Sequence, residues 1–186
     1  MTTLKIFQPT PSGARGFTMI ELMMTMVIAV ILLGIAVPSF KGVLMKYRLD
    51  GATRTLYDDL VAAREESNNG QNAVTICASS DGTTCNETDW AKGHIVFRDP
   101  ANPGVVNAGE VLVVRGETPR TGIKIDGLQL SDNKAFARGY LQFNEAKLDL
   151  TGGVEFTLCY STTPKRTIRV LRNGNINTTQ GTEACS

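Results

Sequence analysis

The sequence predicts an α+β protein in which one long N-terminal helix packs on an antiparallel β-sheet domain. Three observations lead to this prediction. An apolar run near the N-terminus is long enough to cross a membrane. A helical repeat of apolar residues follows it, and short runs typical of strands fill the rest of the chain. The chain has 186 residues, 42% hydrophobic and 20% charged, which fits one domain with an appendage.

The apolar run extends from Phe17 to Val37, and its only ionisable side chain is Glu21. A helix of this length spans about 30 Å, the thickness of the hydrocarbon core of a bilayer. A secretory signal has a shorter apolar core and an A-x-A-like cleavage site, which this segment lacks. Lys5 and Arg15 precede the run without any acid, and positive charge there favours a cytoplasmic leader. The sequence thus predicts an anchored, outward-facing domain.

Glu21 is unexpected in such a segment, because a carboxylate at the centre of a membrane helix costs about 2.5–3.5 kcal/mol. One interpretation is a first-turn residue that the helix dipole favours and lipid headgroups hydrate. The other begins at Gly16 and Phe17, since cleavage between them would create an amine about one helical turn before Glu21. This amine and the carboxylate could then pair within one chain or between neighbouring chains.

The stretch RGFTMIELMMTMVIAVILLGIAVP, residues 15–38, resembles the class III signal of type IV pilins and pseudopilins. Gly16, Phe17 and Glu21 match that pattern position for position. The resemblance implies that a prepilin peptidase cleaves after Gly16 and methylates the new N-terminal Phe17. It also implies that Glu21 guides docking of an incoming subunit against the amine of a neighbour. The expected parts are a leader at 1–16 that is removed, a transmembrane and assembly helix at 17–37, an amphipathic continuation at 38–70 and a globular β domain at 71–186.

The helix is expected to continue past the apolar run with a kink at Pro38, which lacks a backbone donor. Beyond it, apolar residues recur at three- and four-residue steps, with one longer gap. These residues are Phe40, Leu44, Tyr47, Leu56, Leu60 and Ala63. The repeat predicts one helix face packed on a sheet and an end at the SNNG stretch, 67–70. The alternative is two separate helices divided at Pro38.

Short strand-like runs, punctuated by glycine, asparagine and proline, begin at Ala73. We expect strands at residues 73–79, 94–98, 110–116, 122–130, 139–145, 153–161 and 166–172. Together with the long helix, they match the ladle shape of the type IV pilin fold, in which the helix is the handle.

Residues 89–117 narrow the resemblance to the GspH/FimT domain, in which a Trp–x–x–Gly–x–x–Val–Phe–x–Asp run begins a hairpin. The matching residues are Trp90, Gly93, Val96, Phe97 and Asp99. Trp90 is interpreted as a core or hairpin anchor rather than a ligand platform. Ile95 and Phe97 share the strand face opposite to Val96, and this more apolar pair is expected to face the core.

Four cysteines, Cys77, Cys85, Cys159 and Cys185, lie far from the apolar run. Two disulfides in an oxidising compartment are the preferred interpretation, and a tetrathiolate zinc site is the alternative. Cys77 and Cys85 flank a polar turn, SSDGTT, so closing this small loop is natural. Cys159 and Cys185 could then tie the C-terminal tail, whose asparagine, threonine and glycine have little else to hold them. Three pairings are formally possible.

Nothing in the sequence points to an enzyme, a bound metal or a cofactor. His94 is the only histidine, no motif marks a serine or cysteine partner for it, and we expect a partly exposed strand residue. The formal net charge of +1 argues against a chain built to coat nucleic acid.

The densest basic cluster lies near the C-terminal end and consists of Lys165, Arg166, Arg169 and Arg172. Family members that bind DNA tend to carry a Gly–Arg–x–Arg element there, whereas Gly174 is followed by Asn175 in this chain. The basic side chains alternate between the two faces of the expected strand, and no aromatic residues lie among them. They are therefore interpreted as solvated charges at strand ends.

The resemblance implies a minor pilin of FimU or FimT type that primes pilus assembly in a tip complex. Its N-terminal helix would hold it in the inner membrane, with the domain in the periplasm, until it enters the cell-surface pilus. Expected partners are other minor and major pilins and the prepilin peptidase. The alternatives are a DNA-binding minor pilin for natural transformation, which would use the basic cluster, and a minor pseudopilin of type II secretion.

Overall fold

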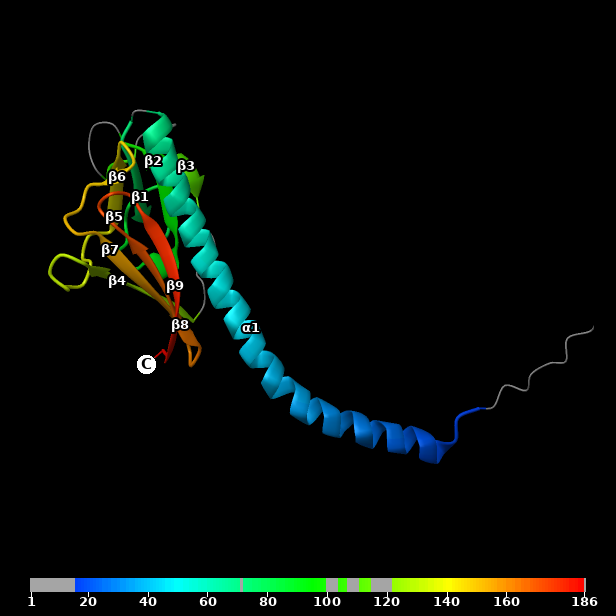
Figure 1. The fold of residues 1–186 in the computed structure, drawn as a ribbon. Helices are drawn as coiled ribbons and strands as arrows, with labels where there is room; N and C mark the ends of the chain where they lie inside the picture. Colours follow the sequence, from blue (N-terminus) through cyan, green and yellow to red (C-terminus); the bar gives the residue numbers. More distant parts are fainter. Residues whose placement is uncertain (1–15, 71, 100–103, 107–110, 115–121, 186) are drawn as a thin grey trace, which may run out of the picture. The chain divides into compact units, whose positions relative to one another are not determined.

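The computed structural model describes residues 16–70, 72–99, 104–106, 111–114 and 122–185 (Figure 1). The chain divides into two compact units, Met1–Lys41 and Gly42–Ser186. Helix α1, Met19–Asn69, contributes its first part to one unit and its second part to the other. The two-helix alternative is therefore wrong, and the helix ends within the SNNG stretch as predicted. The kink expected at Pro38 concerns the mutual orientation of the units and stays a prediction.

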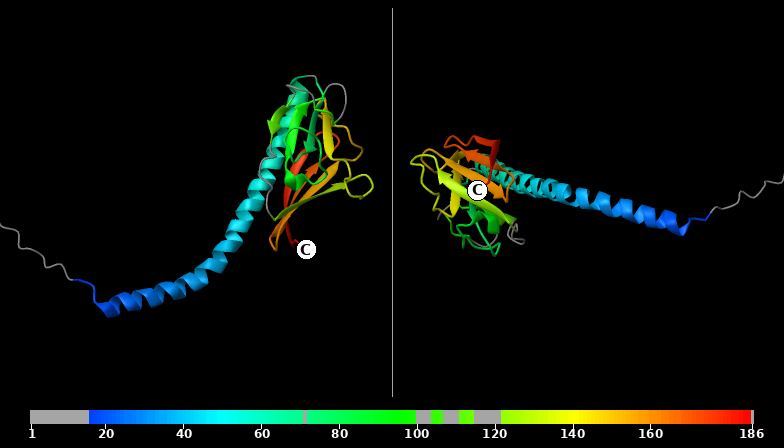
Figure 2. Two further views of the ribbon diagram at one scale, coloured as in Figure 1. Left: turned by 180° about the vertical axis from the view of Figure 1, so that it is seen from behind. Right: turned by 90° about the horizontal axis from the view of Figure 1, so that it is seen from below.

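The described strands of the second unit form two antiparallel sheets (Figure 2). In the first sheet the order is β3-β2-β1-β5-β6, with strands Val111–Val114, His94–Arg98, Val74–Ala78, Tyr140–Asn144 and Lys147–Leu148. In the second the order is β4-β7-β8-β9, with strands Ile123–Gln129, Val154–Tyr160, Pro164–Val170 and Ile176–Ala184. A short 3₁₀ helix, η1 (Trp90–Lys92), precedes β2. The predicted α+β class is confirmed.

The seven expected strands are all present, and their described ends lie within two residues of the predicted ones. The flanks of β3 lie outside the described residues. The short β6 and the long β9 were not predicted. Because β9 pairs with β8 from Ile176↔Val170 to Ala184↔Pro164, the expectation that little besides a disulfide holds the tail is wrong.

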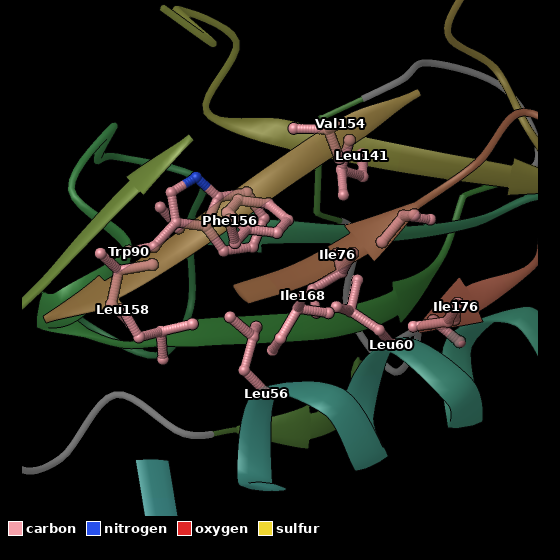
Figure 3. Packing of buried hydrophobic residues seen from close by; sticks show 14 of the residues in the cluster. Leu56, Leu60, Ile76, Trp90, Leu141, Val154, Phe156, Leu158, Ile168 and Ile176 are labelled. Carbon is pink, nitrogen blue, oxygen red and sulfur yellow. The ribbon is translucent and has the colours of Figure 1, made fainter. Parts of the chain in front are cut away.

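One main core lies between the second part of α1 and the two sheets (Figure 3). Leu56 and Leu60 on α1 pack with Ile76 of β1 and Ile168 of β8, and all four are fully buried. Burial of each such side chain contributes about 1.5–3 kcal/mol relative to an exposed position. The core thus joins helix and sheets within Gly42–Ser186.

Trp90 of η1 is part of the same core, with only 2% of its surface exposed. Its ring centroid lies 4.9 Å from that of Phe156, and the two rings are tilted, which is a favourable geometry for a pair of aromatic side chains. The interpretation of Trp90 as a core anchor is confirmed.

The buried face of α1 begins later than predicted. Leu56, Leu60 and Ala63 are buried as expected, but Tyr47 is 74% exposed, and Phe40 and Leu44 are exposed as well. At about 100° per residue, these three lie on the side of the helix opposite to Leu60. Leu49 and Ala52, which occupy the gap in the apparent repeat, are buried instead. The longer gap in the apolar repeat therefore marks the point where the apolar residues move from one face of α1 to the other.

The predicted inner face of β2 is also wrong. Val96 joins the main core, whereas Ile95 and Phe97 form a second, smaller cluster with Cys77 on the other face of the sheet. Partly buried Cys85, Val106 and Tyr140 pack against this second cluster. Both faces of β2 are therefore covered, which alternation of residue types alone did not indicate.

Candidate functional site

In the first unit, α1 exposes its apolar side chains along the whole apolar run. From Phe17 to Ile35, every large apolar side chain is at least half exposed. In the described part of the chain, α1 is the helix with the length and composition to cross a membrane. Exposed apolar surface of this extent is unfavourable in water and suits an apolar environment such as a bilayer or other apolar helices.

Glu21 lies in the first turn of α1. Its backbone nitrogen donates a hydrogen bond to the Thr18 hydroxyl, at 3.3 Å, so Thr18 caps the helix. A carboxylate three residues after a capping threonine is the pattern of a capping box and also suits the positive end of the helix dipole. The carboxylate is exposed, and this geometry agrees with both interpretations of Glu21.

Gly16 and Phe17 precede the helix, in residues without regular secondary structure. Both are exposed, and Phe17 has 79% of its surface accessible. A peptidase needs an accessible, non-helical bond, and the bond between these two residues meets that requirement. The rest of the expected leader, residues 1–15, lies outside the described residues.

The second part of α1 is joined to β2 by two polar contacts. Buried His94 and buried Asp59 face one another, with 2.8 Å between His94 Nε2 and Asp59 Oδ2. Near the surface, Arg98 Nε donates to Glu66 Oε1 at 2.8 Å. The expectation of a partly exposed His94 is wrong, because α1 covers this face of β2. Two acids on α1 thus fix the helix against the sheet.

Asp99, the last residue of the Trp–x–x–Gly–x–x–Val–Phe–x–Asp run, is a buried structural residue. Its Oδ2 accepts hydrogen bonds of 2.8 Å from the Thr75 hydroxyl and from the backbone nitrogen of Gly104. These bonds join the end of β2 to β1 and to Gly104. Trp90 and Asp99 of this run therefore have structural contacts within the domain.

The basic cluster is largely neutralised by carboxylates. Arg166, only 6% exposed, donates from Nε to Asp50 Oδ1 on α1 at 2.7 Å. The other two pairs are Arg169 with Glu155 and Lys165 with Glu183, and Arg172 is exposed just after β8. The interpretation as solvated strand-end charges is therefore wrong for Arg166, which is buried and paired. The ion pair with Glu183 raises the pKa of Lys165, and the same pair lowers the pKa of Glu183.

The four cysteines form two disulfides, Cys77–Cys85 and Cys159–Cys185. The prediction of disulfide bonds is confirmed, and the tetrathiolate zinc alternative is wrong because no thiol is free to bind a metal. The first bond closes the polar SSDGTT turn, where Asp81 accepts hydrogen bonds from the backbone nitrogens of Thr83 and Thr84. The second ties the end of β9 to β7.

Sequence reasoning missed Asp59, Thr18 and β9. A signal for Asp59 was present, since it lies three residues after Leu56 and four before Ala63, on the buried face of α1. Thr18 and Glu21 had the T-x-x-E spacing of a capping box. For β9 the sequence offered no apolar alternation.

An exposed apolar helix that follows a glycine in the sequence, joined to a disulfide-bonded β domain, is typical of a pilin-like protein. The family model described as type II transport protein GspH matches residues 52–174. The model described as prokaryotic N-terminal methylation motif matches residues 11–37. The chain therefore belongs to the GspH family, a family of minor pilins and pseudopilins. Proteins of this class, pilins and pseudopilins, are structural proteins.

Solved structures agree with this fold. The type IV minor pilin FimU of Pseudomonas aeruginosa is similar, with a TM-score of 0.59, 19% identity, and coverage of 76% of this chain and 95% of that one. The minor pseudopilin EpsH of the type 2 secretion system of Vibrio cholerae matches with a TM-score of 0.50 and 10% identity. That match covers 72% of this chain and 97% of EpsH. Among curated proteins, none matches this chain in sequence.

Proposed function

We propose that the chain is a minor type IV pilin that joins other pilins in a tip complex and primes pilus assembly. The observation that carries this proposal is the run of exposed apolar side chains from Phe17 to Ile35, with Glu21 in its first turn. A surface of this kind suits two environments, the bilayer before assembly and the packed helices of neighbouring subunits afterwards. The same helix would therefore serve as anchor and as assembly element.

The proposed maturation removes residues 1–16 on the cytoplasmic side and methylates Phe17. The new amine then lies about one helical turn from the Glu21 carboxylate. An acid in an apolar environment costs free energy unless it is paired, so a neighbour's amine would relieve that cost on docking. Glu21 would thereby set the register between subunits.

The proposed location before assembly is the inner membrane, with the globular unit in the periplasm. The two disulfides suit this placement, because such bonds persist in oxidising compartments. After assembly the domain would be displayed on the pilus at the cell surface. Its partners would be other minor pilins, the major pilin and the prepilin peptidase.

The test is a count of surface pili in a strain that lacks this chain, with retraction active and with retraction disabled. A priming subunit predicts few or no pili when retraction is active and a partial return when it is disabled. Unchanged numbers of pili in both backgrounds would contradict the priming role.

A second candidate is a minor pseudopilin of type II secretion, supported by the match to the GspH family model and the likeness to EpsH. It predicts unchanged pili and reduced export of secreted proteins in the same deletion strain. The DNA-binding alternative gains no support from the site, because carboxylates already pair with Lys165, Arg166 and Arg169.

A further inference from the structure

The second sheet has two edges that differ in how much of their backbone is paired. At the β4 edge, the chain folds back on itself: Gln129 N donates to Lys134 O, and Phe136 N donates to Gly127 O, both at 2.8 Å. At the opposite edge, β9 pairs with β8 only, and no other described strand adjoins it. Figure 2 shows β9, in red, at this edge of the sheet in both views.

The pairing with β8 determines which backbone groups of β9 point outward. Leu171 N donates to Asn175 O at 2.9 Å, so the backbone of Leu171 faces β9 at the first hydrogen-bonded position of the ladder. Hydrogen-bonded and non-hydrogen-bonded pairs alternate in an antiparallel ladder, so Arg169↔Asn177 and Thr167↔Thr179 are hydrogen-bonded pairs. Ile176, Thr178 and Gln180 therefore direct both their N–H and their C=O groups to the open edge.

Few of the features that protect an edge strand are present in this stretch. Natural edges carry lysine, proline, inward-pointing charges or bulges. The only irregularity in the β8–β9 pairing lies between Pro164 and Arg166, beyond the regular part of β9 from Ile176 to Gln180. That part reads INTTQ, and its β-branched residues favour an extended chain.

The structure also holds this edge rigidly in place. Ile176 at the start of β9 is buried in the main core, and Cys185 just after its end is bonded to Cys159. A strand fixed at both ends loses little conformational entropy when it pairs with another chain. The edge is thus pre-organised.

A groove runs beside the open edge, within the second unit. It has a volume of about 400 Å³ and lies between Thr178 and Gln180 of β9 and Asp50, Arg54 and Tyr57 of α1. Asp50 pairs with buried Arg166, and Arg54 lies 3.7 Å from Asp58. Because these charges are balanced, the groove favours uncharged side chains.

We propose that an extended segment of a neighbouring pilin subunit adds to the β9 edge as a further strand, with uncharged side chains in the adjoining groove. Backbone donors and acceptors at strand spacing that no described strand pairs are matched by another polypeptide backbone, while the groove selects its alternate side chains. The inference rests on the proposed function, which supplies neighbouring subunits in the fibre. It assigns one contact between subunits to β9. The packing of the first part of α1 against neighbouring helices would be a separate interface.

The first test blocks the edge. Thr178→Pro removes an N–H that points outward and leaves the ladder to β8 intact. We expect recovery of the chain in sheared pili to fall about tenfold, the effect of losing about 1.4 kcal/mol of binding free energy. Thr178→Val, which keeps the N–H, should be recovered like the wild type. Thr179→Pro removes an N–H that bonds β8 and should lower the melting temperature. Such a decrease would confirm which residues of β9 face β8 and which face the open edge.

The comparison with Glu21→Ala separates failure of this inference from failure of the proposed function. If Thr178→Pro folds and is recovered normally while Glu21→Ala is not, the β9 contact is wrong and the minor-pilin role stands. Absence of the wild-type chain from sheared pili would contradict the proposed function itself, whereas normal recovery of Glu21→Ala would contradict only the role of its carboxylate. The full chain could instead form a dimer in detergent micelles that Thr178→Pro dissociates. This result would overturn the assignment to a different subunit and would show that a second copy of this chain binds the β9 edge.

Hydrogen exchange of the wild-type chain tests the same contact without a substitution. In the full chain in detergent micelles, the amides of Thr178 and Gln180 should exchange rapidly, whereas those of Asn177 and Thr179 should be protected. In purified pili, the first pair should become protected as well. Rapid exchange of Thr178 and Gln180 in pili would overturn the proposal, even if the proline variant failed to fold.

Discussion

The two parts of α1 place their apolar side chains in opposite environments. In the first unit, residues such as Ile28 and Leu33 are more than half exposed. In the second unit, Leu49, Leu56 and Leu60 are fully buried against the sheets. The first part therefore needs another molecule to cover it, whereas the second completes a core within its own chain.

This difference separates function from stability along a single helix. Apolar residues of the second part stabilise the fold, and their loss should be measurable in the isolated protein. Under the proposed function, the apolar residues of the first part and the Glu21 carboxylate act only when a bilayer or a neighbouring subunit is present. A substitution in the second part should therefore lower the stability of the isolated protein, whereas one in the first part should affect membrane or subunit contacts and leave that stability unchanged.

The largest expected effect concerns Glu21. Glu21→Ala should leave membrane insertion intact, because it makes the helix more apolar. It should also keep the cap, since Thr18 receives its hydrogen bond from the backbone nitrogen of residue 21. Without the carboxylate, a neighbour's amine has no partner, and incorporation into pili should fall about tenfold or more. Immunoblots of membranes and of sheared pili measure both quantities.

Glu65→Ala is the matched control in the second part of α1, where the exposed carboxylate should not affect assembly. If Glu21→Ala enters pili as well as the wild type, the assembly role of the carboxylate is wrong and its dipole interpretation is sufficient.

The next effect is on stability and compares two leucines of one helix. Leu60→Ala creates a cavity in the main core and should lower the free energy of unfolding by about 2–5 kcal/mol. Leu33→Ala, at a position 60% exposed, should leave the unfolding of the globular unit unchanged. Denaturant unfolding of the full chain in detergent, followed by Trp90 fluorescence, measures both. Equal effects would contradict the division into two units.

An effect of comparable size is expected from the buried contact between α1 and β2. Asp59→Ala removes the carboxylate 2.8 Å from His94 Nε2 and should destabilise the domain by about 3 kcal/mol. Asp58→Ala is the control, since Asp58 is exposed and lies 3.7 Å from Arg54. It should cost less than about 1 kcal/mol. A cost for Asp59→Ala as small as that of Asp58→Ala would show that the His94 contact does not fix the helix.

The sequence predicted elements well where one physical signal dominated. Unbroken apolar character defined the first part of α1, and strand patterns located the seven expected strands. Cysteines near a polar turn indicated disulfides. The resemblance carried by Gly16, Phe17 and Glu21, together with the Trp90–Asp99 run, pointed to the family that the comparisons show.

The sequence failed where tertiary contacts decided the outcome. Burial of His94 depends on Asp59, which lies 35 residues away in the chain. Both faces of β2 are covered, by α1 on one side and by a cluster around Cys77 on the other, so alternation could not identify an inner face. β9 is polar because one of its edges and most of its side chains face solvent, and its pairing with β8 overrides its composition.

The smallest expected effect concerns the exposed pair between Lys165 of β8 and Glu183 of β9, 2.6 Å apart. The pair lowers the pKa of Glu183 and raises the pKa of Lys165. Its contribution to stability is therefore present above the unfolded pKa of glutamate, about 4.3, and is lost as pH falls through the lowered pKa. It is also present below the unfolded pKa of lysine, about 10.4, and is lost as pH rises through the raised pKa.

Glu183→Gln should accordingly lower the melting temperature only between these limits, by an amount close to the limit of detection, because water and salt screen the pair. Melting curves from pH 3 to pH 11 at low and high salt measure this dependence. The end of β9 is held mainly by the ladder to β8 and by Cys159–Cys185, so a large effect at neutral pH would mean that the ion pair, and not these bonds, keeps the edge in place.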